Sequence, residues 1–120
     1  MQRDLEAYLW DIFNAIEQVE RFVAGLTFEA YLDSELPQAG VERKFEIIGE
    51  AIKQASQHFP GRLDTLPNLS NFARFRDRLA HGYATIKQEI VWEAIQDDIP
   101  PLKQAVAKLL HPGPNSDLTP

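Results

Sequence analysis

Apolar residues recur at every third or fourth position along the first part of the chain. The recurring positions are Leu5, Leu9, Ile12, Phe13, Ile16, Val19, Phe22 and Val23. This spacing puts them on one stripe of a helix, so the pattern predicts an amphipathic helix from about Arg3 to Ala24, ended by Gly25. Thr27 is a suitable cap for a short helical turn through Leu32, before Pro37 interrupts the pattern.

A second helical stripe predicts a long helix from about Gly40 to His58. Its apolar positions are Val41, Phe45, Ile48, Ile52 and Ala55, and Phe59-Pro60-Gly61 follows them. Gly49 lies inside this helix, where it costs about 1 kcal/mol relative to alanine. A helix tolerates such a residue most easily where another helix backbone must come close. We expect that approach within the fold or across a dimer.

The rest of the pattern predicts two more helices and a tail without packing residues. A third helix, capped by Asn68 or Ser70, stops near His81-Gly82, and a fourth spans about Lys87 to Leu110 with Ile90 and Leu109 among its inward-facing positions. Pro100-Pro101 should kink or divide the fourth helix, because two consecutive backbone donors are missing. We therefore expect an all-α protein, an antiparallel up-and-down bundle of four main helices over residues 1–110, with a disordered tail at 111–120.

Composition and charge narrow the classes of function. The chain has no cysteine, which excludes disulfides, thiol catalysis and thiolate zinc sites. The acidic start and the lack of a run of about 20 apolar residues argue against a signal peptide and a membrane span, so we expect a cytoplasmic protein. The net charge of −6 argues against indiscriminate binding of nucleic acid. Residues 71–87 nevertheless carry four cations against Asp77 alone, a net +3 that suggests one local anionic ligand.

The end of the third predicted helix, Arg76 to Tyr83, combines a guanidinium, a carboxylate, an imidazole and a phenol. On a continuous helix Asp77 and His81 are four apart, so Asp77 can hold one ring nitrogen of His81. Arg76 and His81 are five apart, which is about 140° around the axis at 100° per residue. To meet one substrate, the pair needs either a helix that ends at His81, with a sharp exit at Gly82, or a two-fold dimer.

Cleavage of an RNA phosphodiester suits this group of side chains. A histidine near its ordinary pKa can take a proton from a ribose 2′-hydroxyl and return one to the leaving oxygen, while an arginine braces the phosphate. No metal is required, because the substrate supplies the nucleophile. The plain alternative is that His81 only complements the dipole at a helix end, and that Arg76 and Asp77 form a solvated surface.

The segment closely resembles the signature of the HEPN superfamily, in which an arginine, a polar residue and three variable positions precede a histidine. Here these are Arg76, Asp77, residues 78–80 and His81, and the continuation through Gly82 to Tyr83 resembles the HepT-like toxins. Residues 45–51 and the stretches Val91-Trp92 and Ile99–Leu102 also resemble helices of that family. The resemblance covers roughly residues 5 to 110, with Asp77 standing where asparagine is the commonest choice.

The resemblance implies a homodimeric helical toxin of a type VII-like toxin–antitoxin pair that cleaves RNA, with tRNA and mRNA as the expected substrates, and needs no metal or cofactor. Arg76 and His81 would be the catalytic pair, supported by Asp77, with Arg74 and Arg78 binding RNA. It also implies a partner, a minimal nucleotidyltransferase (MNT) antitoxin that transfers AMP onto Tyr83. An anionic group two positions from His81 would fill the cleft and repel RNA.

Two further interpretations of the function stay open from the sequence, a non-catalytic binding module and a scaffold dimer with no ligand. The chain could be a non-catalytic helical module that binds a nucleotide or assists a nucleotidyltransferase, because the same basic spot would serve without proton transfer. Glu50, beside Gly49, could reach the cleft if Gly49 lies at a dimer seam, and its plain interpretation is a solvated helix carboxylate.

Overall fold

The computed structural model describes residues 3–81 and 86–111. In order along the chain, its helices are α1 (Leu5–Val23), α2 (Phe28–Leu32), α3 (Glu35–His58), α4 (Leu69–His81), α5 (Gln88–Asp97) and α6 (Ile99–Leu110). The described part of the chain contains no strand, so the all-α prediction is confirmed. The expected disorder of the tail falls almost wholly on residues 112–120, which lie outside the described ranges.

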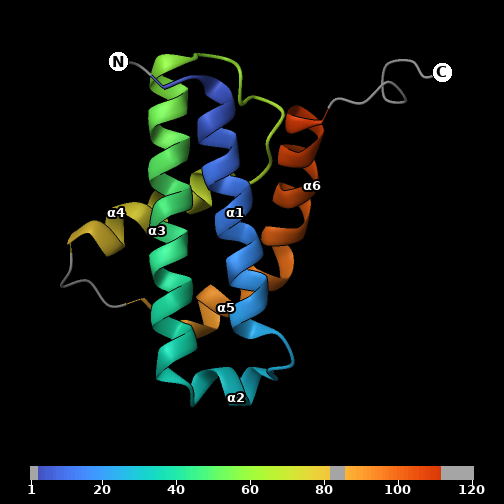
Figure 1. Cartoon of the computed structure of the whole chain (residues 1–120). Coiled ribbons are helices and arrows are strands. Elements are labelled where there is room, and N and C mark those ends of the chain that lie inside the picture. Colours follow the sequence, from blue (N-terminus) through green and yellow to red (C-terminus); the bar gives the residue numbers. More distant parts are fainter. Residues whose placement is uncertain (1–2, 82–85, 112–120) are drawn as a thin grey trace.

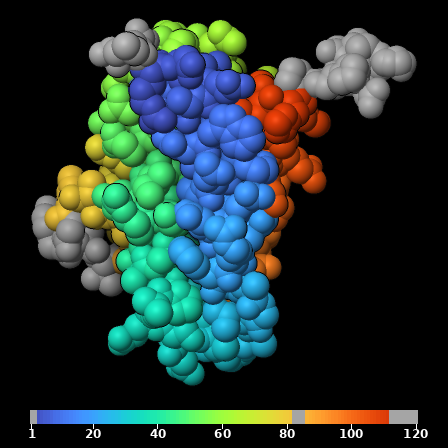
Figure 2. Space-filling view, in the orientation of Figure 1, coloured from blue at the N-terminus to red at the C-terminus, as the bar shows by residue number. Residues whose placement is uncertain are grey.

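The long helices α1 and α3 form the centre of the bundle and lie side by side in opposite directions (Figure 1). Their facing stripes carry the fully buried residues that the spacing predicted, among them Ile12, Ile16 and Val19 on α1 and Val41, Phe45 and Ile48 on α3. Helix α6 packs along α1, and α4 packs on α3. Figure 1 shows α4 crossing α3, and Figure 2 shows α4 at the margin of the face that α1 and α3 form.

Helix α3 begins five residues earlier than the pattern predicted, at Glu35 in place of Gly40. Pro37 therefore lies in its first turn and does not interrupt it. The reason is that the first backbone N–H groups of a helix have no partner within the helix, so a proline there costs no hydrogen bond. The short turn at Thr27 is confirmed as α2, and the Thr27 hydroxyl accepts a hydrogen bond from the Ala30 amide at 3.1 Å.

The predicted interruption at the two consecutive prolines is a break between two helices. Helix α5 ends at Asp97 and α6 begins at Ile99, so Pro100 and Pro101 lie in the first turn of α6. Asp98 joins the two helices: its amide donates to the Ala94 carbonyl at 2.8 Å, and its carbonyl accepts from the Leu102 amide at 3.2 Å. The division lies just before the prolines, because the missing donors cost least at a helix start.

Three residues assigned to the apolar stripes are more exposed than predicted. Phe22 is 38% exposed, Leu109 37% and Ile90 50%. Ile90 lines an open groove between α4 and α5, and the Phe22 ring lies over Gly40 near the chain surface. Among the described residues, no helix is both long enough and apolar enough to cross a membrane.

Candidate active site

Aromatic packing fixes α4, which carries most of the predicted site, onto α3. Phe72 and Phe75 are the buried residues of α4. Their ring centroids lie 5.4 and 5.0 Å from that of Phe45 on α3, both in edge-to-face geometry. Such pairs add to the stabilisation that burial of the rings provides. The other faces of α4 are left for polar side chains.

At Gly49 the α3 and α4 backbones lie close together. A β-carbon built on Gly49 would lie 2.4 Å from Cβ of Arg76 and 2.6 Å from the carbonyl oxygen of Phe72. The predicted close approach is therefore confirmed, and it occurs within the chain. It also means that the stem of Arg76 lies directly over Gly49.

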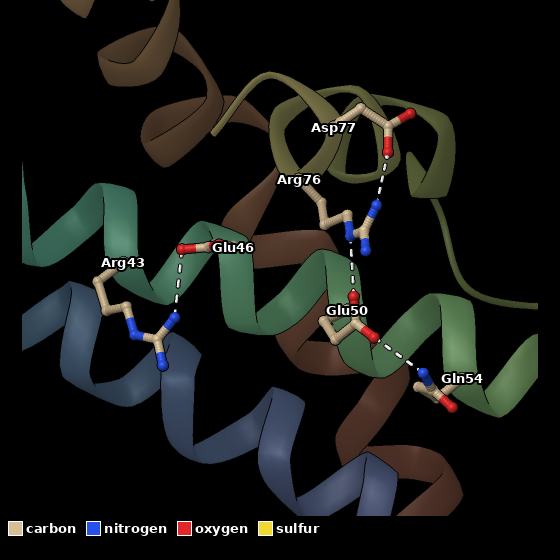
Figure 3. Close-up of polar contacts among 6 residues, drawn as sticks. All are labelled: Arg43, Glu46, Glu50, Gln54, Arg76 and Asp77. Atoms are coloured by element: carbon tan, nitrogen blue, oxygen red, sulfur yellow. Dashed lines mark hydrogen bonds and ion pairs between the residues drawn. The ribbon is translucent and has the colours of Figure 1, made fainter. Parts of the chain in front are cut away.

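Carboxylates from two helices hold the guanidinium of Arg76 (Figure 3). Its Nε donates to Oε1 of Glu50 on α3 at 2.8 Å, and its Nη1 donates to Oδ1 of the neighbouring Asp77 at 3.1 Å. These two hydrogen bonds raise the pKa of Arg76 above its ordinary value, with Glu50 as the larger cause. The side chain of Arg76 is still 25% exposed, so a ligand can reach it.

Glu50 is the residue whose role the sequence interpretation gave wrongly, as a solvated helix carboxylate. It is not simply a solvated carboxylate, and it reaches Arg76 without a dimer seam at Gly49. Its Oε2 accepts a hydrogen bond from Nε2 of Gln54 at 2.8 Å. That bond, followed by the one from Arg76, lowers the pKa of Glu50 below its ordinary 4.5, so the carboxylate is ionised at neutral pH. Gly49, immediately before it, was the available signal, because it marks where α4 approaches.

His81 is the last residue of α4 and is exposed. Because α4 stays helical through His81, Arg76 and His81 leave its axis about 140° apart. Within one chain, their positions on α4 therefore do not share a face. The expected bond between Asp77 and His81 stays a prediction, since the contact that the structure gives for Asp77 is with Arg76. Tyr83 and Gly82 lie outside the described residues.

Arg74 and Arg78, the expected RNA-binding residues, lie in a different hollow from Arg76. They line a groove of about 520 Å³ between α4 and α5, together with Lys87. Acidic residues at α5 and its C-cap line the same groove, namely Glu93, Asp97 and Asp98. The net charge of +3 over residues 71–87 did not predict them. Arg76 borders a second hollow of about 460 Å³, lined by Arg3 and by residues of α1, α3 and α4. The predicted basic spot is thus divided between two sides of α4.

Comparison with known proteins assigns the chain to a family. A family model described as ribonuclease HepT-like matches residues 12–109. "Probable ribonuclease HepT" of Thermococcus cleftensis is 38% identical over 109 residues, which is 91% of this chain and 98% of that protein. A "Putative RNase" of Methanocaldococcus jannaschii is 32% identical over 99 residues, 82% of this chain and 81% of that protein. No solved structure gives a significant match. The chain belongs to the HepT-like ribonuclease family.

Proposed function

We propose that the chain is an endoribonuclease toxin that cleaves RNA with Arg76 and His81 as its catalytic residues and Asp77 as their support. The observation that carries the proposal is the guanidinium of Arg76, held by Glu50 and Asp77 yet still open to a ligand. It lies on the helix that ends at His81, where the resemblance to the HEPN signature falls. Membership of a family named for ribonucleases supports the same activity.

The chemistry balances without a metal ion. The 2′-oxygen of a ribose forms a bond to the adjacent phosphorus, and the bond from phosphorus to the 5′-oxygen of the next nucleotide breaks. An imidazole takes the 2′-hydroxyl proton and an imidazolium returns one to the leaving 5′-oxygen, which leaves a 2′,3′-cyclic phosphate. The guanidinium of Arg76 faces the non-bridging oxygens as their negative charge rises. General acid–base help of this kind contributes about 10²–10⁴-fold.

A homodimer is part of the proposal, because of the angle between the two catalytic residues. Two side chains about 140° apart on one helix cannot approach the same phosphate unless the chain turns back or a second copy contributes. A two-fold axis near the end of α4 would put Arg76 of one chain opposite His81 of its partner. Arg74 and Arg78, in the groove on the other side of α4, are the proposed contacts for RNA phosphates away from the cut. Such contacts weaken as the salt concentration rises.

An MNT nucleotidyltransferase is the proposed antitoxin, and Tyr83 is the proposed acceptor of AMP. Each added phosphodiester brings negative charge to a position two residues from His81, where it repels RNA and occupies the cleft. Mass spectrometry after coexpression with the nucleotidyltransferase should show added AMP on Tyr83. An unmodified Tyr83 in a fully neutralised complex would mean that the antitoxin acts by sequestration.

Cleavage of tRNA and mRNA in the presence of EDTA tests the activity. The wild type should cut RNA to fragments that end in a cyclic phosphate, while Arg76→Ala and His81→Ala should lose most of the activity. Equal cleavage by the wild type and His81→Ala would reject the proposed chemistry, as would no cleavage by either. Nucleotide binding that survives His81→Ala, with RNA left intact, would favour a non-catalytic binding module.

A further inference from the structure

We propose that Glu50 is a positioning residue for Arg76: its carboxylate takes the Nε–H and thereby fixes the direction in which the rest of the guanidinium points. The inference rests on the proposed function, because it assigns a supporting role in the same site. The two atoms in question, Nε of Arg76 and Oε1 of Glu50, lie 2.8 Å apart and belong to different helices, α4 and α3.

The guanidinium is held at two of its three nitrogens. Glu50 takes Nε at 2.8 Å and Asp77 takes Nη1 at 3.1 Å. Because the group is planar, two such bonds fix both its plane and its rotation about the side-chain axis. Nη2 bonds to neither of these carboxylates and is the nitrogen that faces the substrate phosphate. Asp77 alone could not fix the plane, since its own side chain is 67% exposed and lies on the same helix as Arg76.

Glu50 is itself held in place by the helix that carries it. Gln54, one turn further along α3, donates to Oε2 of Glu50 at 2.8 Å, while Oε1 accepts from Arg76 (Figure 3). Both carboxylate oxygens therefore have defined partners. Gly49 completes the arrangement, because the lack of a side chain lets the stem of Arg76 lie against α3. Residues 49, 50 and 54 together form a seat for Arg76, and we call them the Arg76 seat.

The chain offers a matched control in Glu46, one turn before Glu50 on α3. Glu46 pairs with Arg43 at 3.2 Å and lines the same hollow as Glu50 and Arg76. That ion pair joins two residues of α3 and makes no link to α4 (Figure 3). Glu46→Ala therefore removes the same charge from the same surface without touching the Arg76 seat. If Glu50 acted only by repelling RNA, the two substitutions would have the same effect, and both would strengthen RNA binding.

Single-turnover cleavage by the full-length variants gives the kinetic test. We expect Glu50→Ala to lower kcat by about 10- to 100-fold with a much smaller change in KM, because a guanidinium displaced by about 1 Å no longer meets the transition state. Glu50→Gln keeps an oxygen that can accept from Nε, so it should recover a large part of kcat. Glu46→Ala should cleave as the wild type does. Equal rates for Glu50→Ala and Glu46→Ala would overturn the inference.

An NMR measurement tests the inference independently of RNA cleavage. The Nε–H resonance of Arg76, assigned by its loss in Arg76→Lys, should be sharp and slow to exchange with water in the wild type. It should broaden in Glu50→Ala and stay unchanged in Glu46→Ala. An Nε–H signal that is the same in all three proteins would overturn the inference. A sharp wild-type signal in a protein that does not cleave RNA would instead refute the proposed function and leave the seat confirmed.

Discussion

Gly49→Ala is the substitution whose effect follows most directly from the structure. The new β-carbon would lie 2.4 Å from Cβ of Arg76 and 2.6 Å from the Phe72 carbonyl oxygen, whereas ordinary contact begins at 3.4 Å. Neither neighbour is the end of a flexible side chain, because one is backbone and the other is bonded to it. The two helices must therefore separate by about 1 Å, which is the difference between 3.4 and 2.4 Å.

The free energy of unfolding should fall even though alanine favours a helix. Replacing an interior glycine by alanine gains about 1 kcal/mol of helix propensity. Overpacking a tight contact costs about 1–3 kcal/mol, and backbone neighbours favour the upper part of that range. We expect a net loss of about 1–2 kcal/mol. For a chain of this length, that corresponds to a fall in Tm of about 4–8 °C.

Gly40→Ala on the same helix is the control. A β-carbon there would meet only the Phe22 ring, at 2.9 Å, and that ring is 38% exposed and free to turn aside. Gly40→Ala should therefore be neutral or up to about 1 kcal/mol more stable than the wild type. Urea and thermal unfolding of the two variants measure the difference. A Gly49→Ala protein as stable as Gly40→Ala would refute the close approach of α3 and α4.

The remaining predictions concern the packing and the ionisation that support the site. Phe72→Ala should lower the free energy of unfolding by about 3–5 kcal/mol in urea, because the Phe72 side chain is fully buried in the core, with 0% exposed to solvent. A loss below about 1 kcal/mol would contradict the anchoring of α4. Tyr31→Phe should cost about 0.5–1.5 kcal/mol, because it removes the 2.8 Å hydrogen bond from the buried Tyr31 hydroxyl to Gln88 at the start of α5. The depressed pKa of Glu50 means that its pairing stabilises the fold above its ordinary 4.5 and is lost as the pH falls through the folded value. The stability advantage of the wild type over Glu50→Gln should accordingly shrink as the pH falls below 4.5, and a constant difference would show that the ionised carboxylate is not the source.

Local spacing predicted most of the helices, because the apolar stripes report directly on which positions face the core. The start of α3 was missed because Pro37 is compatible with the first turn of a helix as well as with an interruption. Ser34 is the N-cap residue, but its side chain makes no capping hydrogen bond. The exposure of Ile90 was missed because periodicity does not say which helix, if any, covers a given face.

The site was only partly predictable from the sequence, because periodicity does not say which helices pack against one another. Arg76, Asp77 and His81 are near neighbours in the sequence, so their pattern is visible without a structure. Glu50 lies 26 positions from Arg76, and its role depends on the crossing of α3 and α4. The position of Arg74 and Arg78 in a groove that acidic residues also line depends on tertiary packing in the same way.

Mixed dimers test most directly the claim that Arg76 of one chain and His81 of another act on the same phosphate. Arg76→Ala and His81→Ala chains with different affinity tags can be coexpressed, and the mixed dimer isolated by two purification steps. Each variant alone should be inactive, while the mixed dimer should regain RNA cleavage, because it holds one arginine and one histidine on opposite chains. A mixed dimer as inactive as its parents, beside an active wild type, would contradict the account.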